Sequence, residues 1–196
     1  MRPSAHLLLY LLGITKAETQ VTPAERECLL DHASGRRLGA EIGVWHGVTT
    51  SALRRAMDAS GTLYAIDPFP IGRVGFSMQR FIASREVRQA KGAAVQFLRL
   101  TGTESGQRFL ADGLHNFDFV FIDGDHSYEG LQGDWQQWSR LVQAGGCIAL
   151  HDSRSSESRN IEGAGSVRFT KQVIRENKAF EVVSEVESLT VVRRKN

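Results

Sequence analysis

The stretch "FDFVFIDGDHSYEG", residues 117–130, decides the fold that we expect for this chain. Its first six residues are mostly aromatic or aliphatic, which is typical of a strand buried on both faces of a sheet. Asp123, Asp125 and His126 follow at once. Like charges this close repel one another, and their burial is costly unless something compensates. The stretch therefore predicts a buried strand whose end holds a metal, another bound cation or a proton that is to be moved.

Apolar runs and amphipathic segments alternate along the rest of the chain. We expect further strands within residues 37–44, 61–69, 93–100 and 145–152, and a C-terminal hairpin of strands 179–186 and 188–194. Helices are expected at residues 4–13, 22–35 and 49–59, within 70–92, and at 103–112, 128–142 and 167–177. This alternation, with nearly continuous apolar strands, is typical of an α/β protein with a parallel sheet covered by helices on both faces.

The composition is that of one ordinary globular domain. Of the 196 residues, 41% are hydrophobic and 23% are charged, which suits a single sizeable core. A net charge of +2 is too small to favour a nucleic-acid partner. We expect no membrane span, because no stretch approaches the ~20 apolar residues that a span needs. Cys28 and Cys147 do not form a spaced pair; we expect neither a disulfide nor a metal at them, which favours a cytoplasmic protein.

The N-terminal segment "HLLLYLL", residues 6–12, is apolar and follows a positive start. These are features of a secretory signal, but the run Leu7–Leu12 is short and no clean small-residue cleavage site follows it. We interpret the segment as a packing or interface helix, and it suggests a homodimer contact.

Polar residues follow each of the first five predicted strands. They are "GVWHG" (43–47), Asp67, "TGTES" (101–105), "DGDH" (123–126) and "HD" (151–152). In a parallel sheet with helices on both faces, ligands bind outside the carboxyl ends of the strands, near the point where the strand order reverses. The sequence therefore predicts a binding site at this edge of the sheet.

The turn after the first of these strands, "EIGVWHG" (41–47), carries Gly43 and Gly47 in a G-x-x-x-G pattern. A dinucleotide site needs G-x-G-x-x-G, so that backbone can approach the pyrophosphate. Trp45 stands where the second glycine is needed, which disfavours a diphosphate and a nicotinamide-dependent dehydrogenase. Asp67 follows Gly43 by 24 residues, the separation at which a carboxylate reaches a ribose diol. These facts favour a nucleoside without phosphates; simple strand–helix packing is the alternative reason for the glycines.

A family resemblance adds to these inferences. The segments "AEIGVWHGVTT", "LYAIDPF", "FDFVFIDGDHSYEGLQGDW" and "LVQAGGCIALHD" resemble the class I S-adenosylmethionine-dependent methyltransferases. Within that class the chain is similar to the group with an "IDGDHSYE" motif, which includes O-methyltransferases of sugar and natural-product biosynthesis and cephalosporin hydroxylase-like relatives. The resemblance covers about residues 38–152.

The resemblance implies a Rossmann-like sheet of seven strands in the order 3-2-1-4-5-7-6, mostly parallel with the last strand antiparallel. Residues 36–196 would form the domain that binds S-adenosylmethionine (SAM). Residues 1–35 would add N-terminal helices that pack on the core or on the acceptor side of the same globular unit. The implied activity is methyl transfer from SAM, most naturally to a hydroxyl of a small molecule such as a sugar or natural product.

The resemblance also assigns cofactor-binding residues by position. They are Glu41, Gly43, Trp45, Gly47, Asp67, Thr103, Glu104 and Asp123. The turn 41–47 would surround the methionine portion of the cofactor, Asp67 would bind the ribose hydroxyls, and Thr103 and Glu104 would lie near the adenine. Asp123 would face the methionine end and the reaction centre. Trp45 and Tyr128 are also candidates for a wall of the acceptor pocket, or for core packing.

A divalent metal is a second candidate cofactor. In related O-methyltransferases, acids at the tips of strands four and five hold such an ion, and Asp123 and Asp152 match two of them. His151 takes the remaining place. Magnesium prefers oxygen ligands, whereas imidazole suits zinc, manganese or iron, so the histidine leaves the identity of the ion open. The alternatives are a polar strand end bonded to the loop 153–160, or a catalytic role without metal.

Asp125 and His126 are the candidate catalytic residues. An acceptor hydroxyl must lose its proton as it attacks the sulfonium methyl, and a histidine is suited to accept it near neutral pH. Either residue has an alternative role at the start of the next helix. Segment 70–91 is a candidate lid over the acceptor, and it carries Arg73, Arg80, Arg85 and Arg88. The alternative is that these arginines only solvate an exposed helix.

Two other classes of function compete with a methyltransferase. A metal-dependent hydrolase would use the acids and histidines at the ends of strands four and five, namely Asp123, Asp125, His126, His151 and Asp152. It would leave Asp67 and the glycine turn unexplained. The third hypothesis is that the protein binds the cofactor without turnover.

Overall fold

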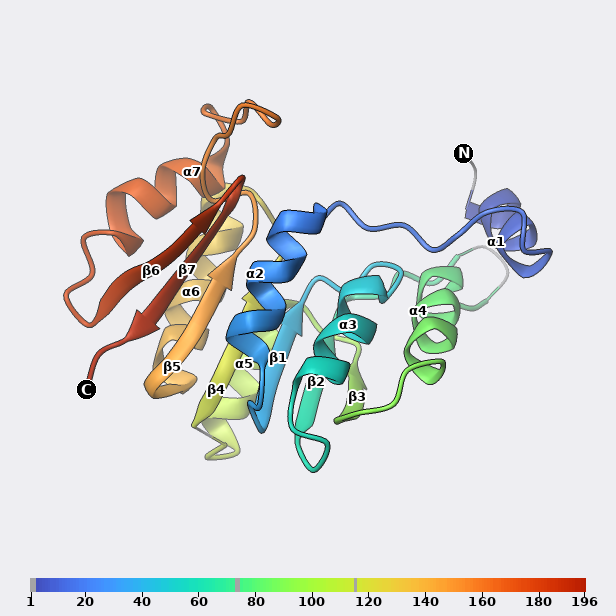
Figure 1. The fold of residues 1–196 in the computed structure, drawn as a ribbon, viewed down its shortest axis with the longest axis horizontal. Coiled ribbons are helices and arrows are strands. Elements are labelled where there is room, and N and C mark those ends of the chain that lie inside the picture. The colour runs from blue at the N-terminus through green and yellow to red at the C-terminus, as the bar shows by residue number, and fades with distance from the viewer. Residues whose placement is uncertain (1–2, 73–74, 115) are drawn as a thin grey trace.

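The fold is that of a computed structural model, which describes residues 3–72, 75–114 and 116–196. At its centre is a seven-stranded sheet in the order β3-β2-β1-β4-β5-β7-β6 (Figure 1). The strands are β1 (Leu38–Ile42), β2 (Thr62–Ile66), β3 (Ala94–Leu98), β4 (Phe117–Ile122), β5 (Val142–Leu150), β6 (Phe180–Val186) and β7 (Leu189–Arg194). Strands β1 to β5 pair in parallel, and β7 is antiparallel to both neighbours. The predicted class and strand order are confirmed.

The helices lie between the strands as the alternation predicts. They are α1 (Pro3–Leu11), α2 (Pro23–Ala33), α3 (Val48–Ala56), α4 (Met78–Arg88), α5 (Gly102–Ala111), α6 (Tyr128–Leu141) and α7 (Gly165–Phe169), which continues as a π-helical turn at Thr170–Ile174. The start of α5 differs from the prediction, because its N-cap is Thr101 and not Thr103. Thr101 accepts a hydrogen bond from the Glu104 N–H and donates its own N–H to the Glu104 carboxylate, which closes a capping box.

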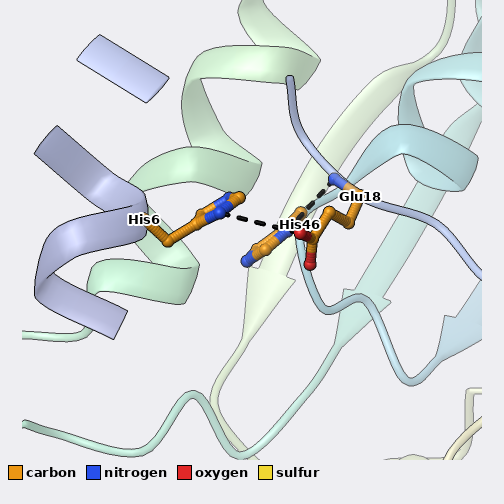
Figure 2. Close-up of side chains that lie close together, drawn as sticks. All are labelled: His6, Glu18 and His46. Atoms are coloured by element: carbon orange, nitrogen blue, oxygen red, sulfur yellow. Dashed lines mark hydrogen bonds and ion pairs between the residues drawn. The ribbon is translucent and has the colours of Figure 1, made fainter. Parts of the chain in front are cut away.

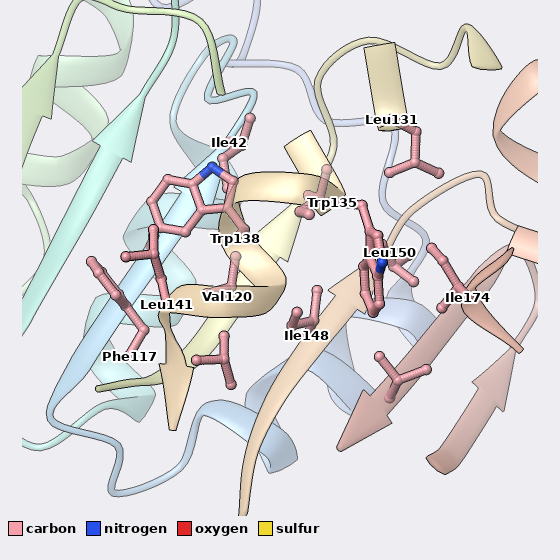
Figure 3. Close-up of a cluster of buried hydrophobic side chains, with 14 of the residues drawn as sticks. Ile42, Phe117, Val120, Leu131, Trp135, Trp138, Leu141, Ile148, Leu150 and Ile174 are labelled. Carbon is pink, nitrogen blue, oxygen red and sulfur yellow. The ribbon is translucent and has the colours of Figure 1, made fainter. Parts of the chain in front are cut away.

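Strand β4 shows why the sheet is covered on both faces. Its side chains alternate, so that Phe119 and Phe121 face α2 and α3, whereas Val120 and Ile122 face α5 and α6. All four are at most 3% exposed. Figure 3 shows the cluster of buried side chains on the α5 and α6 face of the sheet, in which strand residues such as Val120 and Ile148 pack against α6. The largely apolar strand β4 is therefore the middle layer of a three-layer core.

Trp138 of α6 links α6 to α5 within this cluster. Its side chain is fully buried and its indole N–H donates to the Gly102 carbonyl oxygen at 2.9 Å. The ring meets Phe117 at 5.2 Å and Phe109 at 5.7 Å between centroids, both edge to face. The first turn of α5, where the polar residues after β3 lie, is thus anchored to α6.

Helix α1 lies apart from the sheet and packs beside α4 (Figure 1). The Tyr10 hydroxyl donates to Glu86 of α4 at 2.6 Å. The segment 12–22, which we call the strap, then runs back to α2. Leu8 and Leu12 remain 58% and 63% exposed, and the homodimer suggested by this segment stays a prediction. Within the described ranges, no helix combines the length and the apolar character that crossing a bilayer requires.

The Trp138 contact can be tested by substitution. Trp138→Phe should lower the free energy of unfolding by about 2–4 kcal/mol, because it removes core volume and leaves the Gly102 carbonyl without its donor. Trp135→Phe is the matched control: Trp135 is also buried and packs on Phe180, but no hydrogen bond of its indole is found among the described residues. Urea unfolding should show a loss smaller by about 1 kcal/mol for the control; equal losses would contradict the role of the hydrogen bond.

Candidate active site

A cavity of about 700 Å³ opens at the carboxyl ends of the parallel strands. It is lined by residues that follow β1 (Gly43, Val44, Trp45), β2 (Asp67, Pro68), β3 (Thr101, Gly102, Thr103) and β4 (Asp123, Gly124, Asp125, His126). Residues 18–20 of the strap and Asp134 of α6 complete the lining with parts of α3. Four of the five polar strand ends that the sequence predicts at this edge line the cavity. The fifth, His151 and Asp152, is outside the lining and lies next to His126.

Gly43 is the residue at which the turn after β1 crosses the end of β4. Its φ is +90°, and a Cβ at this position would overlap the backbone carbonyl of Asp123. Only glycine fits here, because it has no side chain and tolerates a positive φ. Gly47 has a φ of +75° at the start of α3 and packs against Ala83, outside the cavity lining. The first glycine thus permits a close approach, and the second lets the start of α3 pack against α4.

Asp67 fixes the shape of the same turn. Its Oδ2 accepts the N–H groups of Val44 and Trp45, both at 3.1 Å, and the side-chain amide of Gln79 at 3.0 Å. Its Oδ1 accepts the Phe69 N–H at 2.7 Å. A carboxylate offers about four lone-pair sites, and these donors occupy that number. Asp67 is 7% exposed and borders the cavity.

Glu41 lies beneath the turn and does not line the cavity. It is 1% exposed, and neither carboxylate oxygen has a hydrogen-bond partner among the described residues. Burial, together with the nearby charges of Asp123 and Asp67, raises the pKa of Glu41 well above its usual value, although Thr50 opposes this. The surroundings of Glu41 therefore favour its protonated form.

Asp134 is a site residue that the sequence analysis missed. It lies on α6, is 5% exposed, borders the cavity and accepts the Thr103 hydroxyl at 2.8 Å. Burial raises its pKa to about 6, and Asp125 adds to the rise while Thr103 opposes it. The feature of the sequence that could have identified Asp134 is an acidic residue on the otherwise apolar face of α6. Thr103 itself lines the cavity as predicted, whereas Glu104 is engaged in the capping box and lies outside the lining.

The ends of β4 and β5 bring four of the predicted residues together. The Nδ1 atom of His151 lies 2.8 Å from Asp123 Oδ1. The Nε2 atom of His126 lies 3.7 Å from the same oxygen and 3.8 Å from Asp152 Oδ2. Arg159 contacts Asp152 Oδ2 at 2.7 Å. We call Asp123, His126, His151 and Asp152 the acid–histidine cluster.

Asp125 turns away from this cluster although it is next to His126 in the sequence. Its Oδ1 accepts the Ser127 N–H at 2.9 Å, and its carboxyl packs over Gly130 in the first turn of α6. Ser127 is the N-cap of that helix. Asp125 therefore contacts the first turn of α6 and lies near enough to Asp134 to raise the pKa of that residue.

Glu25, from the N-terminal helix α2, is the second residue that the sequence analysis missed. Its Oε2 lies 3.4 Å from His151 Nε2, and both side chains are 1% exposed. Burial alone would lower the pKa of His151, but the carboxylates of Asp123, Glu25 and Asp152 outweigh it and raise the pKa to about 10. Burial would raise the pKa of Glu25, but contacts with His151, Ser188 and Thr22 lower it to about 2. The only signal in the sequence was a capping glutamate, which gives no hint of burial.

Comparison with known proteins now places the chain. A family model described as a methyltransferase domain matches residues 40–153, more than half of the 196 residues. The chain belongs to this methyltransferase family. The resemblance to the class I SAM-dependent methyltransferases is thereby confirmed, whereas membership of the narrower "IDGDHSYE" group stays a prediction.

Solved structures share the fold of this methyltransferase over almost its whole length. An O-methyltransferase from Bacillus cereus in complex with SAH is 18% identical, with a TM-score of 0.61, over 99% of this chain and 91% of that one. The O-methyltransferase TomG from Streptomyces achromogenes, in complex with SAM, is 15% identical, with a TM-score of 0.65, over 100% and 91%. A cofactor-bound protein from MTB is 20% identical, with a TM-score of 0.71, over 100% and 91%. At these identities the likeness shows the fold alone.

Residues 18–20 of the strap line the cavity of the methyltransferase, and Glu18 lies beside His46 and His6 (Figure 2). The Glu18 N–H donates to His46 Nδ1 at 3.2 Å. His46 stacks between His6 of α1, at 4.9 Å, and Trp45 of the cavity wall, at 4.7 Å. Burial and the neighbouring His6 lower the pKa of His46, while Glu18 and Glu86 oppose this. The stack therefore joins α1 to the turn after β1.

The expected lid at 70–91 is not found over this cavity. None of the described residues of that segment lines it. Arg80, Arg85 and Arg88 of α4 are exposed, and Arg73 lies outside the described residues. Tyr128 also lies outside the lining; it packs edge to face on Phe169 at 5.2 Å and borders the core.

The buried charge of Asp134 predicts a pH dependence. Because its folded-state pKa is raised to about 6 from 3.8, the folded protein binds this proton more tightly than the unfolded chain, and stability falls as the pH rises through that window. Asp134→Asn removes this cost. Its free energy of unfolding relative to the wild type should increase by about 2 kcal/mol between pH 4 and pH 7.5, as measured by urea unfolding. A difference that does not change with pH would contradict the assignment.

Proposed function

We propose that this methyltransferase binds SAM in the cavity and transfers its methyl group to a hydroxyl of a small molecule, such as a sugar or natural product. One observation carries the proposal: a single cavity is bordered by Asp67 with its glycine turn and by Asp123 with His126. Asp67 and the glycine turn suit the binding of an adenosyl group, and Asp123 and His126 suit proton transfer. The two O-methyltransferases among the structures of the same fold support this reaction type.

The cavity offers a place for each part of the cofactor. A ribose diol would reach Asp67 by replacing Gln79, because the other three donors to this carboxylate are backbone N–H groups. Thr103 and Asp134 would border the adenine, to whose amino group the Asp134 carboxylate offers an acceptor. The methionine end would lie between Gly43 and Asp123, beside the acid–histidine cluster.

His126 is the base in this proposal. The cofactor already carries an activated methyl, so the protein must position the acceptor and take up its proton. The His126 side chain is 40% exposed at the cavity, and its Nε2 faces Asp123 and Asp152. Asp125 accepts the Ser127 N–H and packs over Gly130, and the proposal gives it no proton transfer.

The acid–histidine cluster also fits a divalent metal. Ligand atoms of Asp123, His126 and His151 lie within 4.8 Å of one another, and the far nitrogen of His151 faces a carboxylate, as metal-bound histidines usually do. Asp152 is held by Arg159 instead. Two nitrogen donors and one oxygen donor suit zinc, manganese or iron better than magnesium. When bound, such an ion would polarise the acceptor hydroxyl. It would also occupy the nitrogen of His126, so metal binding by all three residues is an alternative to proton transfer by this histidine.

The competing functions are less consistent with the geometry. A hydrolase built on five residues would need Asp125 in the cluster, but Asp125 turns toward Gly130. Binding without turnover is separated from catalysis by the His126 experiment below. A cytoplasmic location is part of the proposal, since Cys28 and Cys147 are free thiols.

The ribose contact predicts opposite effects for two neighbouring residues. Asp67→Asn should weaken binding of S-adenosylhomocysteine (SAH) by about 10–100-fold, because charge-assisted hydrogen bonds to the diol are worth about 1.5–3 kcal/mol. Gln79→Ala should retain or strengthen binding, because it frees the same carboxylate. Isothermal titration calorimetry with SAH measures both. Weaker binding by Gln79→Ala than by Asp67→Asn would contradict the placement of the ribose.

The base is tested by methyl transfer. Labelled SAM is incubated with a panel of sugars and hydroxylated natural products, and methylated products are detected by mass spectrometry. His126→Ala should lower the transfer rate by about 10²–10⁴-fold and leave SAH affinity within about threefold. Asp125→Asn, which changes the neighbouring side chain, should cost less than about tenfold. Transfer that survives in His126→Ala would rule out this residue as the base.

A further inference from the structure

Glu25 is more deeply buried than its place in the helix requires. It stands in the first turn of α2 and closes a capping box, because its Oε2 accepts the Thr22 N–H at 2.9 Å. Capping glutamates of this kind act at helix ends, where water is close by. Glu25 is 1% exposed, and burial of a carboxylate is costly unless it gains compensating contacts. The capping role alone does not account for this burial.

The compensating contacts come from two distant parts of the chain. Ser188, in the turn between β6 and β7, donates its N–H and its hydroxyl to Glu25 Oε1 at 2.9 and 2.6 Å. Oε2 faces His151 Nε2 at 3.4 Å. With Oε1 held by Ser188 and Oε2 held by Thr22, the carboxylate is fixed in one orientation toward the histidine.

His151 in turn has carboxylates on both sides of its ring. Nε2 faces Glu25, and Nδ1 faces Asp123 at 2.8 Å. The ring is 1% exposed, and Phe121 meets it edge to face at 6.3 Å between centroids. Flipping the ring by half a turn about the Cβ–Cγ bond would move both nitrogens away from these oxygens. The two carboxylates together therefore set the orientation of the ring.

We propose that Glu25 is a positioning residue of the active site: it holds Nε2 of His151 and thereby presents Nδ1 to Asp123 and His126. The inference rests on the proposed function, in which Nδ1 of His151 is a donor to a divalent ion. A carboxylate behind a metal-binding histidine fixes the ring and strengthens the donor. The N-terminal segment 1–35 thus supplies a functional group to the reaction centre.

Zinc binding by the full-length protein tests the role. Glu25→Gln keeps the size of the side chain but replaces one oxygen with an N–H donor, which opposes the ring N–H. Zinc affinity, measured by competition with a chelator, should fall about 10–100-fold, while SAH affinity stays within about threefold. Thr22→Ala is the matched control: it removes the N-cap of the same helix and destabilises it, but leaves the contact of Glu25 with His151, so zinc affinity should not change.

Each outcome decides the inference. Equal zinc affinities for Glu25→Gln and wild type overturn it, and so does an equal loss in Thr22→Ala, which would make the effect one of helix stability. If Glu25→Gln does not fold, Ser188→Ala, which removes the hydroxyl donor to Oε1 and keeps the backbone N–H, should show a smaller loss of zinc affinity; no loss overturns the inference. Wild-type protein that binds SAH but not zinc, manganese or iron overturns the metal site and this inference with it. Protein that binds zinc but not SAH overturns the cofactor proposal, and the comparison with Glu25→Gln still decides the role of Glu25.

Discussion

The close approach of Gly43 to the Asp123 carbonyl is the constraint on which the site depends. It lets the turn after β1 lie directly over the end of β4, so that the binding turn and the acid–histidine cluster share one cavity. Asp67 then holds that turn by accepting two of its backbone N–H groups. A side chain at position 43 would separate the two strand ends, and with them the two halves of the site.

The charges at the ends of β4 and β5 are compensated within the protein. Asp123 faces His151 and His126, Asp152 faces Arg159, and Glu25 faces the other side of His151. This arrangement explains how adjacent acids are tolerated at a buried edge of the sheet. It also leaves His126 as the more exposed member of the acid–histidine cluster, where an acceptor can reach it.

The N-terminal 35 residues take part in the site from two directions. The strap lines the cavity and is joined to Trp45 by the stack of His46 and His6. Helix α2 brings Glu25 to the Nε2 atom of His151. A segment that carries no recognisable motif is therefore placed where it can influence both the cofactor turn and the acid–histidine cluster.

The sequence by itself determined the elements, the layered sheet and the edge that carries the chemistry, because periodicity and polar strand ends are local properties. It also brought Gly43, Asp67, Asp123 and His126 to one cavity, since parallel strands end at the same edge. Only the tertiary structure decided that Asp134 and Glu25 lie at the site, that Asp125 turns away, that Glu104 serves as a cap, and that the strap rather than segment 70–91 lines the cavity. The physical reason is that these roles depend on which side chains meet across long stretches of chain, and packing, rather than local pattern, sets those meetings.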